Sequence, residues 1–122
     1  MVVYIKTHEM SSAVTAMMFT GRLTLGNQLS DVEYAIRERI VQGLRRLVLD
    51  FSGLDYIDSA GIGVIAVCIG LMQRAGGKLA VVGATGQVKQ LLELTNLNQV
   101  AEIYPDLASA QSALSMPPAP PV

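Results

Sequence analysis

The sequence contains very few of the residues that bind metals or cross-link a small domain. It has one cysteine, Cys68, and one histidine, His8, in 122 residues. A single cysteine cannot form an internal disulfide, and neither residue has the neighbours that a zinc site requires. Because Cys68 lies within an apolar run, we expect it to be a small core residue. No metal site and no cofactor is therefore predicted.

The sequence also lacks an excess of one charge and any apolar run long enough to span a bilayer. Nine basic and ten acidic residues give a net charge of −1, and the two signs are mixed along the chain. This pattern predicts no binding to nucleic acid or to an anionic membrane. The richest apolar stretch, residues 62–72, is far shorter than the ~20 residues of a transmembrane helix. Lys6, His8 and Glu9 do not fit a secretory leader, so we expect a cytoplasmic protein.

What the sequence does have is enough apolar residues for one well-buried domain. Hydrophobic residues make up 51% of the chain, and a chain of this length buries roughly two-thirds of its unfolded surface. We expect the domain to span residues 1–115. Residues 116–122 contain four of the five prolines and are expected to form a flexible tail.

Alternation of β-rich runs with amphipathic segments predicts an α/β fold. In chain order we expect strands at 2–7 and 14–20, a helix at 29–40, a strand at 46–50, a helix at 60–74, a strand at 78–82, a helix at 85–94, a strand near 100–103 and a helix at 106–114. A short polar connection makes the first two strands an antiparallel hairpin, and strands linked through helices run parallel. The prediction is a mixed, mostly parallel sheet of about four to five strands with about four helices, in which strand 46–50 is central.

The most informative stretch follows strand 46–50, where a polar loop leads to Ser59 at the start of a helix. We expect Ser59 to be the N-cap, with its hydroxyl facing the free N–H groups of Gly61 and Ile62. A phosphate is tolerated at such a position because the helix N-terminus carries partial positive charge. Three loops are expected to meet at this edge of the sheet: residues 22–28, 52–59 and 83–86.

Two glycines in the first turns of this helix need an explanation. Gly61 and Gly63 each cost roughly 1 kcal/mol relative to alanine in a helix. Close approach of a partner's backbone is one explanation, and close packing of the helix on the sheet is the other. The sequence leaves both open.

Four short motifs together closely resemble the STAS domain of bacterial anti-sigma factor antagonists. They are Gly21-Arg22-Leu23, Asp58-Ser59-Ala60-Gly61-Ile62-Gly63, Gly76-Gly77-Lys78-Leu79 and Leu91-Leu92-Glu93-Leu94-Thr95. The resemblance covers residues 2–114 with the order of elements intact. The second motif is the most specific, because it falls at the predicted junction of strand, loop and helix.

The resemblance implies a regulatory protein rather than an enzyme. In this family a partner anti-sigma factor, a serine kinase of the histidine-kinase ATPase type, phosphorylates the antagonist, and a serine phosphatase restores it. Ser59 would be the phosphoacceptor, and the unmodified protein would bind the kinase and free the sigma factor. No nucleic acid, membrane or small-molecule substrate is implied. The expected partner-binding residues are Asp58, Ala60, Gly61, Ile62, Gly63, Thr24, Leu25, Gly26, Asn27, Tyr56 and Thr85.

One position departs from the family pattern. Many antagonists carry an aspartate that helps engage the kinase, in a Gly-x-Leu-Asp pattern, where this chain has Thr24. The alternative is therefore a STAS scaffold or adaptor subunit of a larger signalling or lipid-transport assembly. In that alternative Ser59 is only a cap and there is no phosphoswitch.

Enzymatic interpretations fit less well. Residues 83–89 resemble a dinucleotide-binding fingerprint, but Lys89 replaces the last glycine and no acidic residue ends a following strand. Asp50 ends an apolar strand as in a response-regulator receiver, yet the acidic pair and the later lysine of a receiver are missing. A hydrolase would need a histidine or an acid pair near Ser59, and His8 lies in the first strand.

Overall fold

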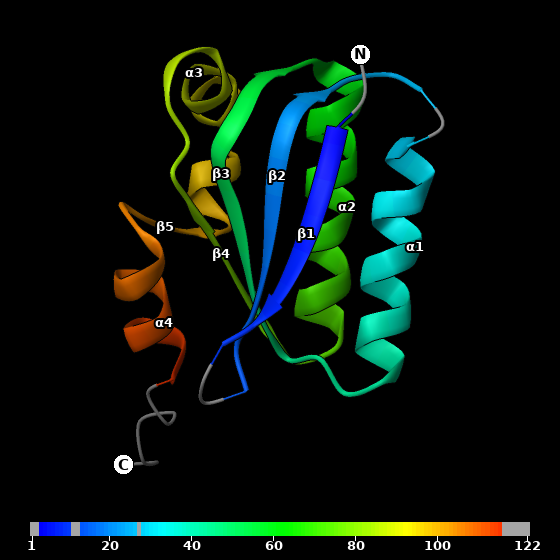
Figure 1. Ribbon diagram of the computed structural model, residues 1–122, viewed down its shortest axis with the longest axis vertical. Helices are drawn as coiled ribbons and strands as arrows, with labels where there is room; N and C mark the ends of the chain where they lie inside the picture. Colours follow the sequence, from blue (N-terminus) through cyan, green and yellow to red (C-terminus); the bar gives the residue numbers. More distant parts are fainter. Residues whose placement is uncertain (1–2, 11–12, 27, 116–122) are drawn as a thin grey trace.

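A mixed five-stranded sheet is the centre of the computed structural model, which describes residues 3–10, 13–26 and 28–115 (Figure 1). Asn27 and the predicted tail at 116–122 lie outside these ranges. In chain order the elements are β1 (Val3–Glu9), β2 (Thr15–Leu23), α1 (Gln28–Val41), β3 (Arg46–Ile57), α2 (Ser59–Arg74), β4 (Lys78–Val82), α3 (Gly86–Leu94), a 3₁₀ helix (Leu97–Gln99), β5 (Glu102–Tyr104) and α4 (Leu107–Ser115).

The strands lie in the sheet in the same order as in the chain. β1 pairs antiparallel with β2, and β2, β3, β4 and β5 follow in parallel pairs. The predicted hairpin, the predicted α/β class and the central place of β3 are therefore confirmed. Because the parallel strands share one direction, their carboxyl ends meet at one edge of the sheet, at the top of Figure 1.

β3 is longer than the sequence predicted. Residues 52–57 were expected to be a loop, but they continue the strand to Ile57 and pair with β2. The pairing of β3 with β4 ends at Asp50, so the extension has a neighbour on one side only. In this extension Ser52 and Asp55 are exposed, and Leu54 and Ile57 are buried. The polar residues are those of a half-covered strand, which resembles a loop in composition.

Helices cover the two faces of the sheet unequally. α1 and α2 lie side by side against one face and enclose the larger apolar core. Within it the Phe19 and Phe51 rings meet edge to face, with their centroids 5.3 Å apart. α4 packs on the other face over a smaller cluster that includes Val48, Ala80 and Leu114. The thick core on the α1 and α2 side therefore holds most of the buried apolar surface.

The apolar helix α2 is buried on the sides that face the sheet and α1. Its solvent side carries only small residues over most of its length, including Gly63, Ala66 and the partly exposed Val67. Cys68 is fully buried, as expected, and burial raises the pKa of its thiol to about 12. Within the described residues, we find no helix whose length and apolar content suffice to cross a membrane.

Removing the Phe51 ring tests how much the larger core contributes to the free energy of unfolding. Phe51→Ala leaves a cavity against Phe19 and should lower the free energy of unfolding by about 3–5 kcal/mol. Leu94→Ala is the control because Leu94 is exposed at the end of α3, and it should change that free energy by less than about 0.5 kcal/mol. Urea denaturation followed by circular dichroism measures both. Equal losses for the two variants would contradict the assignment of the core.

Candidate functional site

Ser59 lies at the carboxyl edge of the sheet, but it is not the cap of the helix that follows. The prediction of Ser59 as N-cap was wrong: the cap is Asp58, whose backbone is extended and whose carboxylate accepts a hydrogen bond from Gly61. Ser59 is the first residue of α2 and is exposed. An aspartate caps a helix as well as a serine does, so capping leaves the Ser59 hydroxyl with no structural task. Among the described residues that hydroxyl has no hydrogen-bond partner.

The Asp58 carboxylate joins two segments that are far apart in the chain. Its Oδ1 accepts from the Gly61 N–H at 2.8 Å, and its Oδ2 accepts from the Leu25 N–H at 2.9 Å. Burial works to raise the pKa of Asp58, but backbone N–H donors from Gly61, Leu25 and Ala60 outweigh it and hold the pKa below its usual value of 3.8. The carboxylate is therefore ionised at neutral pH and fastens the β2–α1 loop to the start of α2.

This fastening presents the β2–α1 loop beside Ser59. Leu25 is 81% exposed, although its backbone is held by Asp58. Thr24 is half-buried and Gly26 is exposed. The loop therefore offers an apolar side chain to solvent from a fixed backbone, an arrangement suited to contact with a partner protein.

Tyr56 is the last residue but one of β3. It contacts a residue that the sequence analysis did not assign to the site. The Arg22 guanidinium lies 4.4 Å from the centre of the Tyr56 ring, in a cation–π contact between the ends of β2 and β3. Arg22 and Tyr56 are paired in the strand register. The motif around Arg22 was recognised, but only knowledge of the register could have placed it against Tyr56.

Gln87 is a second residue that the sequence analysis missed. Its side-chain amide donates from Nε2 to the Ile57 carbonyl at 2.7 Å, and its Oε1 accepts from the Ile57 N–H at 3.0 Å. The pairing of β4 with β3 ends at Asp50, so Ile57 has no backbone partner on the β4 side. The two bonds from Gln87 take the place of that partner. Thr85, one of the expected partner-binding residues, occupies the cap position of α3, but its side chain makes no capping bond and is exposed.

The two glycines of the motif have different environments. A Cβ on Gly61 would collide with the Leu23 carbonyl oxygen and lie 2.7 Å from Ile57 Cγ1, so this glycine allows α2 to pack closely on the sheet. Gly63 faces open space and is exposed. Ile62 is buried and Ala60 is half-buried. Helix–sheet packing therefore explains Gly61, and of the four residues after Ser59 only Gly63 is fully at the surface.

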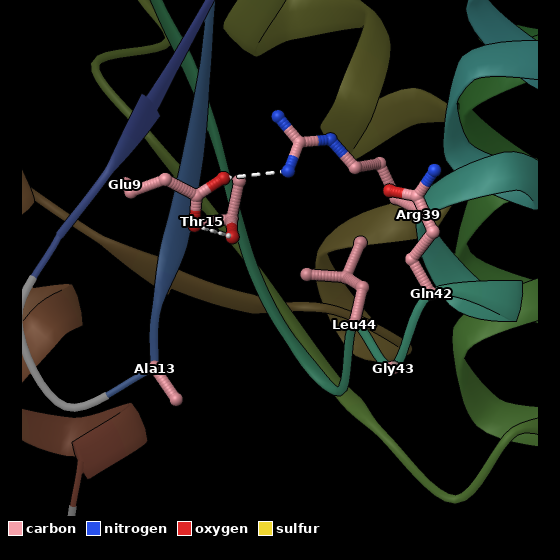
Figure 2. A pocket seen from close by; sticks show the side chains of 7 residues that line it. All are labelled: Glu9, Ala13, Thr15, Arg39, Gln42, Gly43 and Leu44. Atoms are coloured by element: carbon pink, nitrogen blue, oxygen red, sulfur yellow. Dashed lines mark hydrogen bonds and ion pairs between the residues drawn. The ribbon is translucent and has the colours of Figure 1, made fainter.

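A separate polar cavity of about 290 Å³ lies at the opposite end of the sheet (Figure 2). There the Glu9 carboxylate accepts from the Thr15 hydroxyl at 2.9 Å and from Arg39 at 2.6 Å. Both bonds hold the pKa of Glu9 below its usual range, with the Thr15 bond the larger cause. These contacts tie the end of β1 to the last turn of α1, which is a structural role. No group of three potential metal ligands occurs in the part of the chain that the structure describes.

Comparison with models of protein families shows to which family the chain belongs. The model of the STAS domain matches residues 6–110, so this chain belongs to the STAS domain family. The match contains every strand and helix that forms the Ser59 site.

Two relatives are named as regulators of sigma-factor control. A Thermotoga maritima protein, described provisionally as an anti-sigma factor antagonist, is 28% identical over 97 residues, or 80% of this chain and 86% of the relative. The anti-sigma F factor antagonist of Paenibacillus polymyxa is 31% identical over 70 residues, or 57% of this chain and 60% of the relative.

Solved structures share the fold at lower identity. A Thermotoga maritima crystal structure with the same provisional description superimposes with a TM-score of 0.83 at 24% identity, over 92% of this chain and 95% of the other. The unphosphorylated form of the anti-sigma factor antagonist SpoIIAA gives 0.70 at 12% identity, over 90% and 96% of the two chains. Its phosphorylated form, from Bacillus, gives 0.72 at 13% identity, over 90% and 99%.

The two bonds that Asp58 accepts, from Gly61 and Leu25, are called the Asp58 clamp. The clamp should make the free energy of unfolding depend on pH. Asp58→Ala removes a helix cap and the Leu25 bond, so it should lower the free energy of unfolding by about 1–2 kcal/mol at pH 7. Since the folded-state pKa of Asp58 is depressed, its stabilisation is present above pH ~4 and is lost as the pH falls through the folded pKa. The difference in the free energy of unfolding between wild type and Asp58→Ala should therefore become smaller as the pH is lowered. Asp55→Ala, which removes an exposed carboxylate from the same strand, is the control, and a gap independent of pH would contradict the clamp.

The two glycines predict opposite responses to the same substitution. Gly61→Ala should lower the free energy of unfolding by about 1–3 kcal/mol because the new methyl group overlaps the Leu23 carbonyl. Gly63→Ala should raise it by about 0.5–1 kcal/mol because alanine is the better helix former and nothing obstructs it. Thermal or urea denaturation of the pair tests the geometry, and destabilisation of both would show that Gly63 is also packed.

Proposed function

We propose that this chain is a cytoplasmic anti-sigma factor antagonist whose partner is an anti-sigma factor serine kinase of the histidine-kinase ATPase type. In this proposal the unphosphorylated chain binds the kinase, phosphorylation of Ser59 ends the complex, and a serine phosphatase restores it. The chain has no catalytic activity of its own. The names of the two relatives support the regulatory role, and the kinase and phosphatase are the finer part of the proposal.

The main support for the proposal is that Ser59 is exposed and is not needed as a helix cap. Its side chain is exposed on the first residue of α2, and Asp58 has taken the capping role that would otherwise occupy a hydroxyl there. A kinase can therefore reach Ser59 without unwinding the helix. Removal or modification of the hydroxyl breaks no hydrogen bond among the described residues.

The position of Asp58 also explains how a phosphate would end binding. The Asp58 carboxylate already accepts from the Gly61 N–H, so the helix N-terminus has an anion before any phosphate arrives. Phosphoserine would add about −1.5 to −2 charge beside it. A partner surface packed on Leu25 and Gly63 would have to desolvate that charge. The domain stays folded while the complex dissociates.

Thr24 changes the electrostatics of the docking loop. A half-buried, neutral side chain stands where many relatives place a carboxylate. The kinase of this chain is therefore expected to rely less on a cation opposite residue 24 and more on apolar contact with the exposed Leu25.

Two baits test the switch. Ser59→Ala should retain a kinase-type ATPase from a lysate of the native host, and Ser59→Asp should lose it, with mass spectrometry naming the protein. Ser112→Asp is the matched control, because it places the same charge on an exposed serine of α4, away from the site. Both aspartate variants should keep the free energy of unfolding within about 0.5 kcal/mol of wild type.

The outcomes separate the two functional candidates. Loss of the ATPase with Ser59→Asp alone supports the phosphoswitch. Recovery of the same protein with every bait, or of no ATPase with any, favours a STAS scaffold subunit in which Ser59 is not modified.

A further inference from the structure

Charges that are mixed along the chain are separated in the folded domain. Six of the nine basic residues lie in segments 37–46 and 74–78, with Glu38 as the single acid, which gives these segments a net charge of +5. The remaining chain has three basic and nine acidic residues, a net charge of −6. The two segments meet where the Lys78 N–H donates to the Arg45 carbonyl at 2.8 Å. They form the end of the sheet opposite Ser59, at the bottom of Figure 1.

Part of this basic end has a structural task. Arg39 is paired with Glu9, and the Arg45 guanidinium donates to the carbonyl oxygens of Ile40 and Leu44 at 3.0 and 2.7 Å. Cations at the C-termini of α1 and α2 also complement the helix dipoles. Ile40, and Arg74 at the end of α2, also line a neighbouring groove, and Arg37 and Arg74 flank it.

That groove runs between the last turns of α1 and α2. It is a cavity of about 420 Å³ whose floor and walls are apolar and whose two charged lining residues are both cationic; its lining residues are Arg37, Ile40, Val41, Leu71, Arg74 and Ala75. Val41 is 84% exposed at its rim. Arg37 makes one surface bond to Glu33, at 3.3 Å and largely solvent-exposed, a pairing worth little. Arg74 has no ion pair among the described residues, so both guanidinium groups remain available to a stronger acceptor.

We propose that this groove binds an acidic amphipathic helix of a partner protein. Two helices lying side by side leave a furrow that fits the apolar ridge of a third helix, as in other helix-in-groove complexes. Carboxylates beside that ridge would face Arg37 and Arg74, and bidentate pairing with arginine favours such acceptors. A nucleic acid backbone would gain nothing from the apolar floor. A membrane surface would find one large exposed apolar side chain, Val41, and no aromatic anchor among the lining residues.

The groove is independent of the Ser59 surface. Ser59 begins α2 and Arg74 ends it, and a helix of 16 residues is ~24 Å long. Partners at the two ends would therefore not touch the same residues. The inference does not depend on phosphorylation, and a failed switch would leave it unaffected.

A synthetic peptide tests the groove directly. The probe is a peptide of about 14 residues with leucines at i, i+3, i+4 and i+7, glutamates only at the positions beside that ridge and alanines elsewhere, which favours a helix; it is titrated into the ¹⁵N-labelled full chain. Amide shifts should be confined to residues 37–41 and 71–75. The Arg37→Glu/Arg74→Glu variant should bind about tenfold more weakly. Lys6→Glu/Lys89→Glu has the same net charge at distant exposed positions and should bind within about twofold of wild type.

Several results would overturn the proposal. Equal weakening by the two double variants would show that only net charge matters. Shifts spread over the whole surface would show that binding is not confined to the groove, and no shift at all would show that the groove binds no such helix. Equal binding to a peptide with lysines in place of the glutamates would show that the arginines do not select acidic partners. Tighter, groove-dependent binding to phosphatidylserine vesicles or to duplex DNA would assign the basic end to a membrane or to nucleic acid instead.

Discussion

Two backbone N–H groups from distant parts of the chain converge on the carboxylate of Asp58, and the geometry of the Ser59 site depends on them. One comes from Gly61 in the first turn of α2, and the other comes from Leu25 after β2. A single ionised side chain therefore terminates a helix and fixes a loop at once. The exposed surface around Ser59 is consequently assembled before any partner arrives, so binding does not have to order it.

Sequence patterns predicted most of the fold because its elements have strong local signals. Three kinds of signal are each contained within a single short segment: the period of apolar residues in α1, the unbroken apolar runs of β3 and β4, and the Gly76-Gly77 stop. What failed depended on contacts across the chain. The polar second half of β3 is a strand because β2 pairs with it. Asp58 and Ser59 are equally good N-caps by residue type, so the sequence could not show that the helix begins at Ser59 with Asp58 as its cap. Gln87 could not be assigned to Ile57 without the place where β4 ends.

The motif residues were located correctly, yet similar neighbours in the sequence proved to have different tasks. Gly61 is required by the Leu23 carbonyl beneath it, and Gly63 meets nothing. Spacing alone cannot separate them, since both fall in the first two turns of one helix. The charge pattern has the same limitation. Basic residues that alternate with acids in the sequence of α1 gather at one end of the domain because α1 and α2 both run toward it.

Because Cys68 lies on the buried side of α2, its rate of chemical labelling can report how often α2 separates from the core. Burial raises the pKa of the Cys68 thiol to about 12, so little of it is reactive thiolate near neutral pH, and the side chain is fully buried. Thiol-reactive dyes can therefore modify the protein only while α2 is detached from the core. Since no second cysteine competes for the reagent, the labelling rate reports how often this helix leaves the sheet, without any engineered probe.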